Sequence, residues 1–179
     1  SPDNRYVIVC DLGLDRIFTY RLDLDNARLV PASPAFVATP PGSGPRHFAF
    51  SADGRHAYVI CEMGSLIVAY DYASSSGTLT PLQQISTLPA DFHGASTCAE
   101  IRLHPNGRFL YGSNRGHDSI AVYAISPADG RPSLVEIVPC GGRNPRNFSL
   151  SPDGRWLVCA NQNSNALSVF AVDAATGRL

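Results

Sequence analysis

The fold is decided by residues 99–125, which read AEIRLHPNGRFLYGSNRGHDSIAVYAI. Apolar and polar residues alternate up to the turn HPNGR, and the segments FLYGS and IAVYAI continue that period on either side of a polar elbow, NRGHDS. Such alternation indicates β-strands, because successive side chains of a strand point to opposite faces of its sheet. The stretch therefore predicts three consecutive strands joined by short connections.

The same plan occurs four times along the chain. Its turn motifs SPDNR, SADGR, HPNGR and SPDGR begin at residues 1, 51, 104 and 151, so successive copies are 50, 53 and 47 residues apart. In every copy the turn arginine precedes an aromatic residue by 15 positions. A constant interval inside copies of variable spacing indicates a structural repeat, and a period near 50 residues is typical of propeller blades.

The turn motifs carry a strong hairpin signal. Asp-Gly or Asn-Gly occupies 53–54, 106–107 and 153–154, and Asn4 replaces the glycine in the first copy. These pairs favour tight hairpins in which both central residues have positive φ. By contrast, the proline-rich stretch 31–44 (PASPAFVATPPGSG) predicts a loop between the first and second copies.

The predicted fold is an all-β propeller built from four-stranded antiparallel blades. We expect about 14 strands, in groups of three, four, four and three, over residues 1–39, 45–87, 99–139 and 145–179. This amounts to roughly three and a half blades in one partial propeller domain, 1–179. Two β-sandwiches are the alternative, but they would not require the constant 15-residue interval.

Composition narrows the classes of partner. The 179 residues are 44% apolar with a net charge of −1, and no basic stripe or long apolar run occurs. We therefore expect no nucleic-acid partner and no membrane span. The chain begins at a turn and stops where a fourth outer strand should begin, so we expect it to be part of a longer chain.

The cysteines and the tryptophan are expected to be core residues. Five cysteines without a paired spacing argue against a disulfide framework. They are interpreted as small buried hydrophobic residues in a reducing compartment, which predicts a cytoplasmic protein. The single tryptophan, Trp156, is likewise expected to be buried.

Propeller topology predicts where the polar side chains converge. Each innermost strand begins, and each second strand ends, at the same mouth of the central channel. The strand bodies are apolar, whereas these strand ends are polar. We expect the following residues to gather at that mouth: Arg46, His47, Glu62, Glu100, Arg115, Arg146, Asn147, Asn161 and Gln162.

These residue types suit a binding or catalytic site for a small anionic ligand. Arginine offers a planar fork for phosphate or carboxylate, and glutamate or histidine can act as a general base. The alternative is a solvated rim of ion pairs, Arg46 with Glu62 and Arg115 with Glu100, that closes the blades together. No HExxH motif, Cys/His quartet or GxSxG motif is present, so neither a metal, another cofactor nor a serine triad is expected.

The chain resembles a known family in four stretches. These are CDLGLDRIFTYRLD (10–23), GSGPRHFAFSADGR (42–55), AEIRLHPNGRFLYGSNRGHDSIAVY (99–123) and NPRNFSLSPDGRWLVCANQNSNALSVF (144–170). They are similar to the lactonase family of seven-bladed propellers, which includes bacterial 6-phosphogluconolactonases and fungal carboxymuconate cyclases. A family member is about twice as long as this chain. The resemblance implies a lactone-handling site made of His47 in GPRH, Glu100 in AEI, Arg115 in SNRG and Arg146 in PRNF.

The resemblance implies hydrolysis of a sugar lactone, with 6-phosphogluconolactone of the pentose phosphate pathway as the expected substrate. Arg46, Arg115 and Arg146 would hold the phosphate or the developing oxyanion, while Glu100 or His47 would activate water. Two alternatives stay open: a carboxymuconate-type lactonising cycloisomerase, and a non-catalytic propeller that only binds ligands. Because an open half-ring leaves two blade faces uncovered, we also expect either self-association of two copies or a longer chain.

Overall fold

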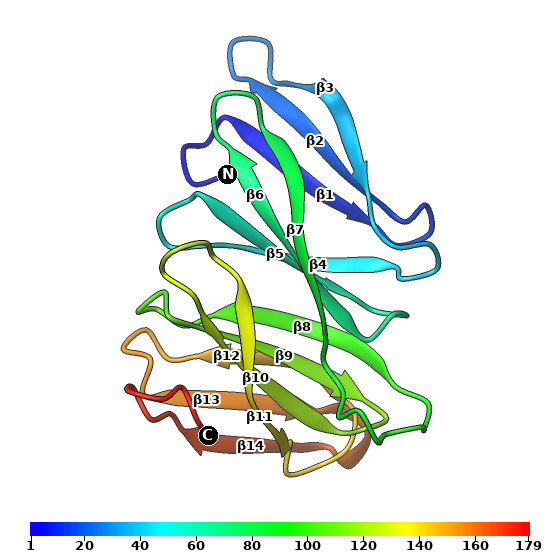
Figure 1. Cartoon of the computed structure of the whole chain (residues 1–179), viewed down its shortest axis with the longest axis vertical. Helices are drawn as coiled ribbons and strands as arrows, with labels where there is room; N and C mark the ends of the chain where they lie inside the picture. The colour runs from blue at the N-terminus through cyan, green and yellow to red at the C-terminus, as the bar shows by residue number, and fades with distance from the viewer.

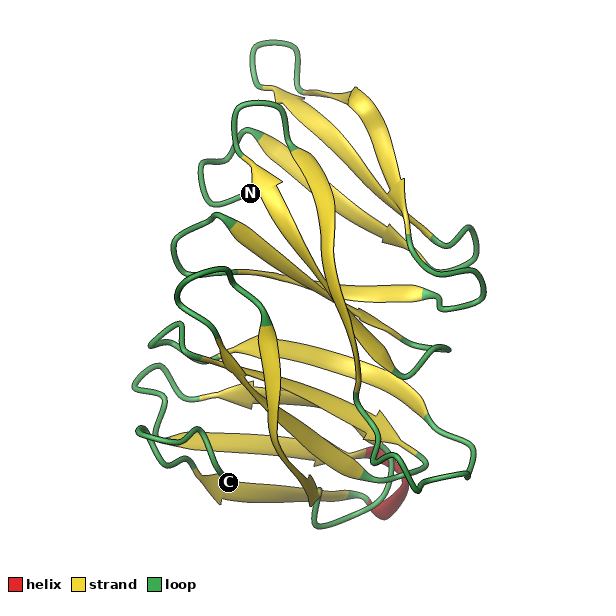
Figure 2. Ribbon diagram, in the orientation of Figure 1, coloured by secondary structure: helices red, strands yellow, loops and turns green.

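The computed structural model describes all residues, 1–179, and is almost entirely β-sheet. Its strands form four antiparallel sheets of three, four, four and three strands, which confirms the expected propeller arrangement. Figure 1 shows the sheets following one another in chain order, from the blue N-terminal sheet to the red C-terminal one. The one helical segment is a short 3-10 turn, Gln162–Ser164, coloured red in Figure 2.

Each sheet is made of strands that are consecutive in the sequence. The first sheet contains β1 (Tyr6–Asp11), β2 (Arg16–Asp23) and β3 (Arg28–Ala38). The second contains β4 (Pro45–Phe50), β5 (His56–Cys61), β6 (Leu66–Ala73) and β7 (Thr78–Ser86). The third contains β8 (Thr97–Leu103), β9 (Phe109–Arg115), β10 (Ser119–Ile125) and β11 (Pro132–Pro139). The fourth contains β12 (Pro145–Leu150), β13 (Trp156–Asn161) and β14 (Ala166–Ala171).

The core lies between successive sheets. Three separate apolar clusters fill the three spaces between neighbours, and each draws side chains from both sheets that it joins. Tyr70 and Tyr123, two of the aromatic residues at the constant interval, are completely buried in these clusters. Stacking thus removes the apolar faces of the sheets from water, which is the main stabilising term of such a fold. No helix in this structure has the length and apolar character needed to cross a membrane.

The turns of the repeat differ from the expected tight hairpins. Only the glycine of each Asp-Gly or Asn-Gly pair has positive φ, and the preceding residue does not. In the second copy, Ser51 N–H donates to the His56 carbonyl at 2.9 Å and Gly54 N–H donates to the Ser51 carbonyl at 3.0 Å, so the loop is longer than two residues. The Asp53 carboxylate accepts from Ser51 Oγ at 2.6 Å and from Arg55 Nε at 2.7 Å. Aspartate therefore serves this position through the hydrogen bonds of its carboxylate, and not because the position requires a positive φ.

The predicted loop 31–44 is wrong in its first half. Strand β3 continues to Ala38 and pairs with β2, where Val37 lies opposite Ile17. Two prolines are accommodated there because β3 is the edge strand of its sheet and the ladder contains a register shift between Phe18 and Tyr20. An edge strand or a bulge tolerates the missing N–H of proline.

The two outermost sheet faces are uncovered and apolar, as expected for an open array. Trp156 is therefore not a core residue: it is 46% exposed on the fourth sheet, beside exposed Val158 and Val169. The first sheet exposes Val9 and Phe36. All five cysteines are unpaired, and four of them are buried, which agrees with their interpretation as small apolar residues.

Candidate active site

The innermost strands bring the predicted site together. Strand β4 contacts β8, and β8 in turn contacts β12, so equivalent positions of three sheets lie side by side. Each strand has a register shift at its polar start: between Pro45 and His47, between Cys98 and Ile101, and between Pro145 and Asn147. Such bulges bend a strand and redirect its side chains, and they are frequent next to active sites.

Glu100 is the centre of the first cluster. Its Oε1 lies 3.0 Å from His47 Nδ1, and its Oε2 accepts a hydrogen bond from Asn147 Nδ2. Arg102 Nε lies 3.5 Å from the same Oε1. The Glu100 side chain is only 4% exposed, whereas that of His47 is 37% exposed. One buried carboxylate therefore joins residues from three different sheets.

The environment of Glu100 favours its ionised form. Burial by itself would raise the pKa of this carboxyl group. The hydrogen bond and charge of His47, the charge of Arg102 and the N–H of Ile101 outweigh burial, so the pKa of Glu100 is lowered. An ionised Glu100 orients the histidine with its proton on Nδ1, which leaves Nε2 able to accept a proton.

Glu62 is the centre of the second cluster. Its two carboxylate oxygens bind Arg46 NH1 at 2.8 Å and Arg115 NH2 at 2.7 Å. Arg46 Nε also donates to the Ala99 carbonyl at 3.0 Å, and Arg115 NH2 donates to that of Cys98 at 2.7 Å. Burial would raise the pKa of Glu62, but its bonds to the two arginines lower it. The cluster ties the second sheet to the third.

The two expected ion pairs have different outcomes. The pair of Arg46 with Glu62 is confirmed, but the pair of Arg115 with Glu100 is wrong, because Arg115 binds Glu62. Glu62 and Arg115 occupy the same position at the ends of neighbouring second strands, β5 and β9, and so lie side by side. Glu100 instead belongs to the inner strand β8, where its neighbours are the inner strands β4 and β12.

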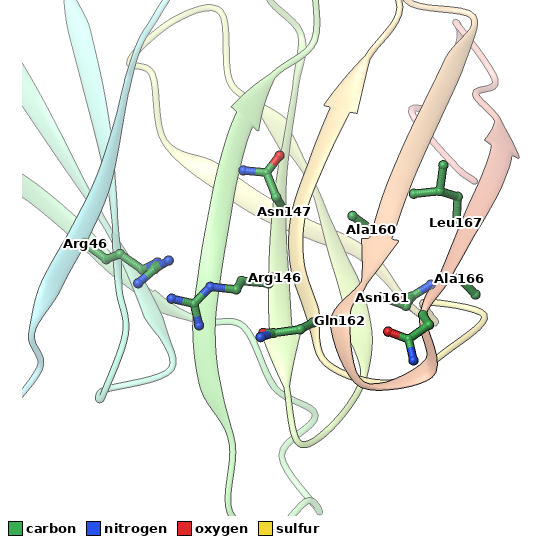
Figure 3. A pocket seen from close by; sticks show the side chains of 9 residues that line it. Arg46, Arg146, Asn147, Ala160, Asn161, Gln162, Ala166 and Leu167 are labelled. Atoms are coloured by element: carbon green, nitrogen blue, oxygen red, sulfur yellow. The ribbon is translucent and has the colours of Figure 1, made fainter.

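A cavity of about 680 Å³ lies beside these clusters. Figure 3 shows Arg46 and Arg146 reaching toward one another from β4 and β12. The Arg146 side chain makes no hydrogen bond or ion pair with the protein and is exposed, unlike Arg46 and Arg115. Asn147 both lines the cavity and binds Glu100, so it connects the cavity to the first cluster. The cavity is lined by Arg46, Arg146, Asn147, Ala160, Asn161, Gln162, Asn165, Ala166 and Leu167.

Two further predicted ligand-binding residues, like Arg46, Arg115, Glu62 and Asn147, are bonded to the protein itself. Asn161 is buried, and its Nδ2 donates to Ser168 Oγ at 2.9 Å and to the Cys140 carbonyl at 3.3 Å. Gln162 Oε1 accepts from Asn144 Nδ2 at 2.8 Å. Both residues lie in the cavity wall, where these bonds position the loop that follows β13.

Some residues of the site were not among the candidates. Arg102 approaches Glu100 because the two are separated by one position on β8 and therefore share a face of the strand. The two-residue period could have identified it. Asn165 lines the cavity from the loop before β14, and Ala166 and Leu167 line it from the first residues of that strand.

The sequence of the chain is similar to those of proteins named as lactonases. A family model described as "Lactonase, 7-bladed beta-propeller" matches residues 1–179. The 6-phosphogluconolactonase of Bacillus subtilis is 38% identical over 148 residues, which cover 83% of this chain and 41% of that protein. This chain spans about half the length, or less, of the relatives that it matches.

Two solved structures are very similar to this one. The periplasmic gluconolactonase PpgL of Pseudomonas aeruginosa has a TM-score of 0.94 and 43% identity, covering 99% of this chain and 50% of that one. A protein from Lactobacillus plantarum has a TM-score of 0.94 and 36% identity, covering 100% of this chain and 51% of that one. These matches extend over all four sheets.

Proposed function

The chain belongs to the lactonase family of seven-bladed β-propellers, and from this premise we propose that the protein hydrolyses a sugar lactone. The observation that carries the proposal is the contact between buried Glu100 and the half-exposed ring of His47 at 3.0 Å. A carboxylate behind a histidine is the arrangement that holds an imidazole ready to accept a proton. The unpaired Arg146 lines the cavity together with Asn147, the partner of Glu100, and supplies a cation for an anionic substituent of the substrate.

The reaction follows from these roles. His47 Nε2 takes a proton from water as the water oxygen bonds to the lactone carbonyl carbon. The charge that develops on the carbonyl oxygen is stabilised by the guanidinium of Arg46, which lines the same cavity. The ring C–O bond then breaks, and the leaving oxygen takes the proton from His47. The products are a hydroxyl group and a carboxylic acid on one open chain; the acid then ionises to a carboxylate by releasing its proton to water, and no cofactor takes part. Glu100 acts as the positioning residue, because its lowered pKa makes it a weak base.

The finer substrate assignment rests on Arg146. We propose 6-phosphogluconolactone as the substrate, with Arg146 binding the phosphate and Arg46 held beside it by Glu62. The relatives named above include a 6-phosphogluconolactonase and a gluconolactonase. Their named substrates differ by one phosphate group, so a free cation in the cavity favours the phosphorylated one. Five unpaired cysteines also fit the proposed cytoplasmic location.

Substitution of the histidine and the carboxylate tests the proposal. His47→Gln and Glu100→Gln are each expected to lower kcat for lactone hydrolysis by about a hundredfold or more, as loss of a general base or its partner does. Hydrolysis is followed as acid release from 6-phosphogluconolactone and gluconolactone, above the uncatalysed rate. The matched controls are His93→Gln and Asp91→Asn, which change exposed residues of the long loop before β8.

Three outcomes would contradict the proposal. The parent protein could leave both lactones unhydrolysed, which would favour a binding module. Both site variants could retain the parental kcat, which would remove the mechanism. A carboxymuconate, assayed in parallel, could be cyclised in place of lactone hydrolysis, which would favour the cycloisomerase.

A further inference from the structure

Arg102 has an unusual position among the innermost strands. It lies two positions after Glu100 on β8, and the residues at the equivalent positions are Ala49 on β4 and Ser149 on β12. Both of these side chains are small and uncharged, so Arg102 carries the one charge at this level of the three strands. Its side chain is 51% exposed, makes no hydrogen bond with the protein and has Glu100 as its one ionic contact.

Three donors approach the same oxygen of Glu100. Glu100 Oε1 lies 3.0 Å from His47 Nδ1, accepts the N–H of Ile101 at 3.1 Å and lies 3.5 Å from Arg102 Nε. A carboxylate oxygen offers about two lone-pair sites, and the two shorter contacts occupy them. Arg102 is the third neighbour, so it acts on the carboxylate through its charge and not through a hydrogen bond.

Few other charges reach this pair. The charged groups at the same end of β1, β4, β5, β8, β9 and β12 are Asp11, Arg46, Glu62, Glu100, Arg102, Arg115 and Arg146. Asp11 accepts an N–H of its own elbow at 3.0 Å, and Glu62 binds Arg46 and Arg115. Arg146 lies in the cavity wall opposite Arg46 (Figure 3). Burial raises the pKa of the nearby thiols to about 11 or about 12, so they stay uncharged near neutral pH.

Glu100 and Arg102 therefore remain as the two opposite charges beside the imidazole of His47. A carboxylate next to Nδ1 favours the doubly protonated ring, which cannot accept a proton from water. A guanidinium on the same carboxylate opposes the charge of that ring and weakens the negative potential of Glu100. It also helps to keep the carboxylate ionised, in agreement with the lowered pKa of Glu100.

We propose that Arg102 is a positioning residue that acts through Glu100 to keep Nε2 of His47 unprotonated at neutral pH. Its role in catalysis rests on the proposed function, in which Nε2 takes a proton from water. The interaction among the three charges does not depend on that function. Arg102 does not line the cavity, so it sets the pH range of the base without contacting the substrate.

A series of charges at position 102 tests the proposal. Arg102→Lys, Arg102→Gln and Arg102→Glu place charges of +1, 0 and −1 at this half-exposed position. The readout is the pH at which kcat/KM for gluconolactone or 6-phosphogluconolactone falls to half on the acid side. We expect Arg102→Lys to keep the parental value, Arg102→Gln to raise it by about half a pH unit and Arg102→Glu to raise it by about one unit.

A second readout does not require lactonase activity. The Cε1–H resonance of His47 is followed by NMR as the pH changes, and it is identified by its absence from the spectrum of His47→Gln. The midpoint of this titration should move in the same order as the acid side of the rate profile. The differences between the variants should shrink in about 1 M salt, because salt screens charges at exposed positions. Arg28→Gln is the matched control, since Arg28 is exposed at the start of β3 in the first sheet.

Two results would overturn the proposal, whether or not the parent protein hydrolyses lactones. One is a His47 midpoint that stays unchanged in Arg102→Gln and Arg102→Glu. The other is a midpoint that moves equally in Arg102→Lys and Arg102→Gln, because the size of the side chain and not its charge would then matter. A midpoint that follows the charge at position 102 in a protein without lactonase activity would support the interaction and contradict the proposed function.

Discussion

At the scale of single residues, burial separates the roles of two side chains that the sequence leaves equivalent. His47 and Glu100 are both candidates for the base when only their positions are known. In the structure, Glu100 is enclosed by three hydrogen-bonding neighbours and has a lowered pKa, while His47 keeps one nitrogen free. The same distinction applies to the arginines, because Arg46 and Arg115 are paired and Arg146 is not.

Arg146 is therefore expected to distinguish anionic from neutral lactones. Arg146→Gln should raise KM for 6-phosphogluconolactone by about tenfold or more, because a charge-assisted hydrogen bond contributes about 1.5–3 kcal/mol. KM for unphosphorylated gluconolactone should change little. Arg143→Gln is the matched control, since Arg143 is exposed three positions earlier. An equal rise in KM for both lactones would show that Arg146 does not bind the phosphate group.

At the scale of strands and hairpins, two local features matter most. Bulges at the starts of β4, β8 and β12 redirect the polar side chains of the site. Left-handed glycines in the outer hairpins let aromatic rings pack on the next sheet. Neither feature follows from the two-residue period, because both depend on what lies opposite the strand.

Gly130→Ala measures the contact between the His56 ring, at the start of β5, and Gly130, in the hairpin between β10 and β11. The new Cβ would lie 2.4 Å from His56 Cγ, so we expect a loss of about 1–2 kcal/mol for the left-handed backbone and about 1–3 kcal/mol for overpacking. Urea unfolding gives the free energies. Gly42→Ala is the matched control, since Gly42 also has positive φ but no atom lies within 4 Å of its added Cβ. Adding His56→Ala to the Gly130→Ala variant should recover the part of the free energy of unfolding that overpacking removed. Equal losses of free energy in Gly130→Ala and Gly42→Ala would contradict the contact.

At the scale of the whole molecule, two carboxylates fasten the sheets at the channel mouth. Glu100 of β8 binds side chains of β4 and β12, and Glu62, directly after β5, binds Arg115 of β9. The pKa of each carboxylate is lowered from an ordinary value of 4.5. The folded state therefore binds fewer protons than the unfolded state in this range, and the stabilisation is lost as pH falls through the folded pKa values.

The expected result is a loss of stability in acid that depends on these two groups. The contribution of these two groups to the free energy of unfolding should be fully present well above pH 4.5 and be lost as the pH falls below it. The loss in acid should therefore be less steep for Glu62→Gln/Glu100→Gln than for the parent. At neutral pH, Glu62→Gln alone should lower the free energy of unfolding by about 3 kcal/mol, because it leaves two arginines unpaired. Urea unfolding across pH measures both effects, with exposed Asp91→Asn as control. Parallel curves for parent and double variant would contradict the assignment.

The sequence by itself determined the repeat, the four sheets and the set of polar strand ends. Periodicity and turn motifs act over a few residues, so His47, Glu100 and Arg146 could be placed at one mouth from their spacing alone. Tertiary structure decided which of these groups meet. The partner of Arg115, the free state of Arg146 and the exposure of Trp156 depend on bulges and on which sheet lies opposite. Those contacts join residues far apart in the chain, and no local pattern encodes them.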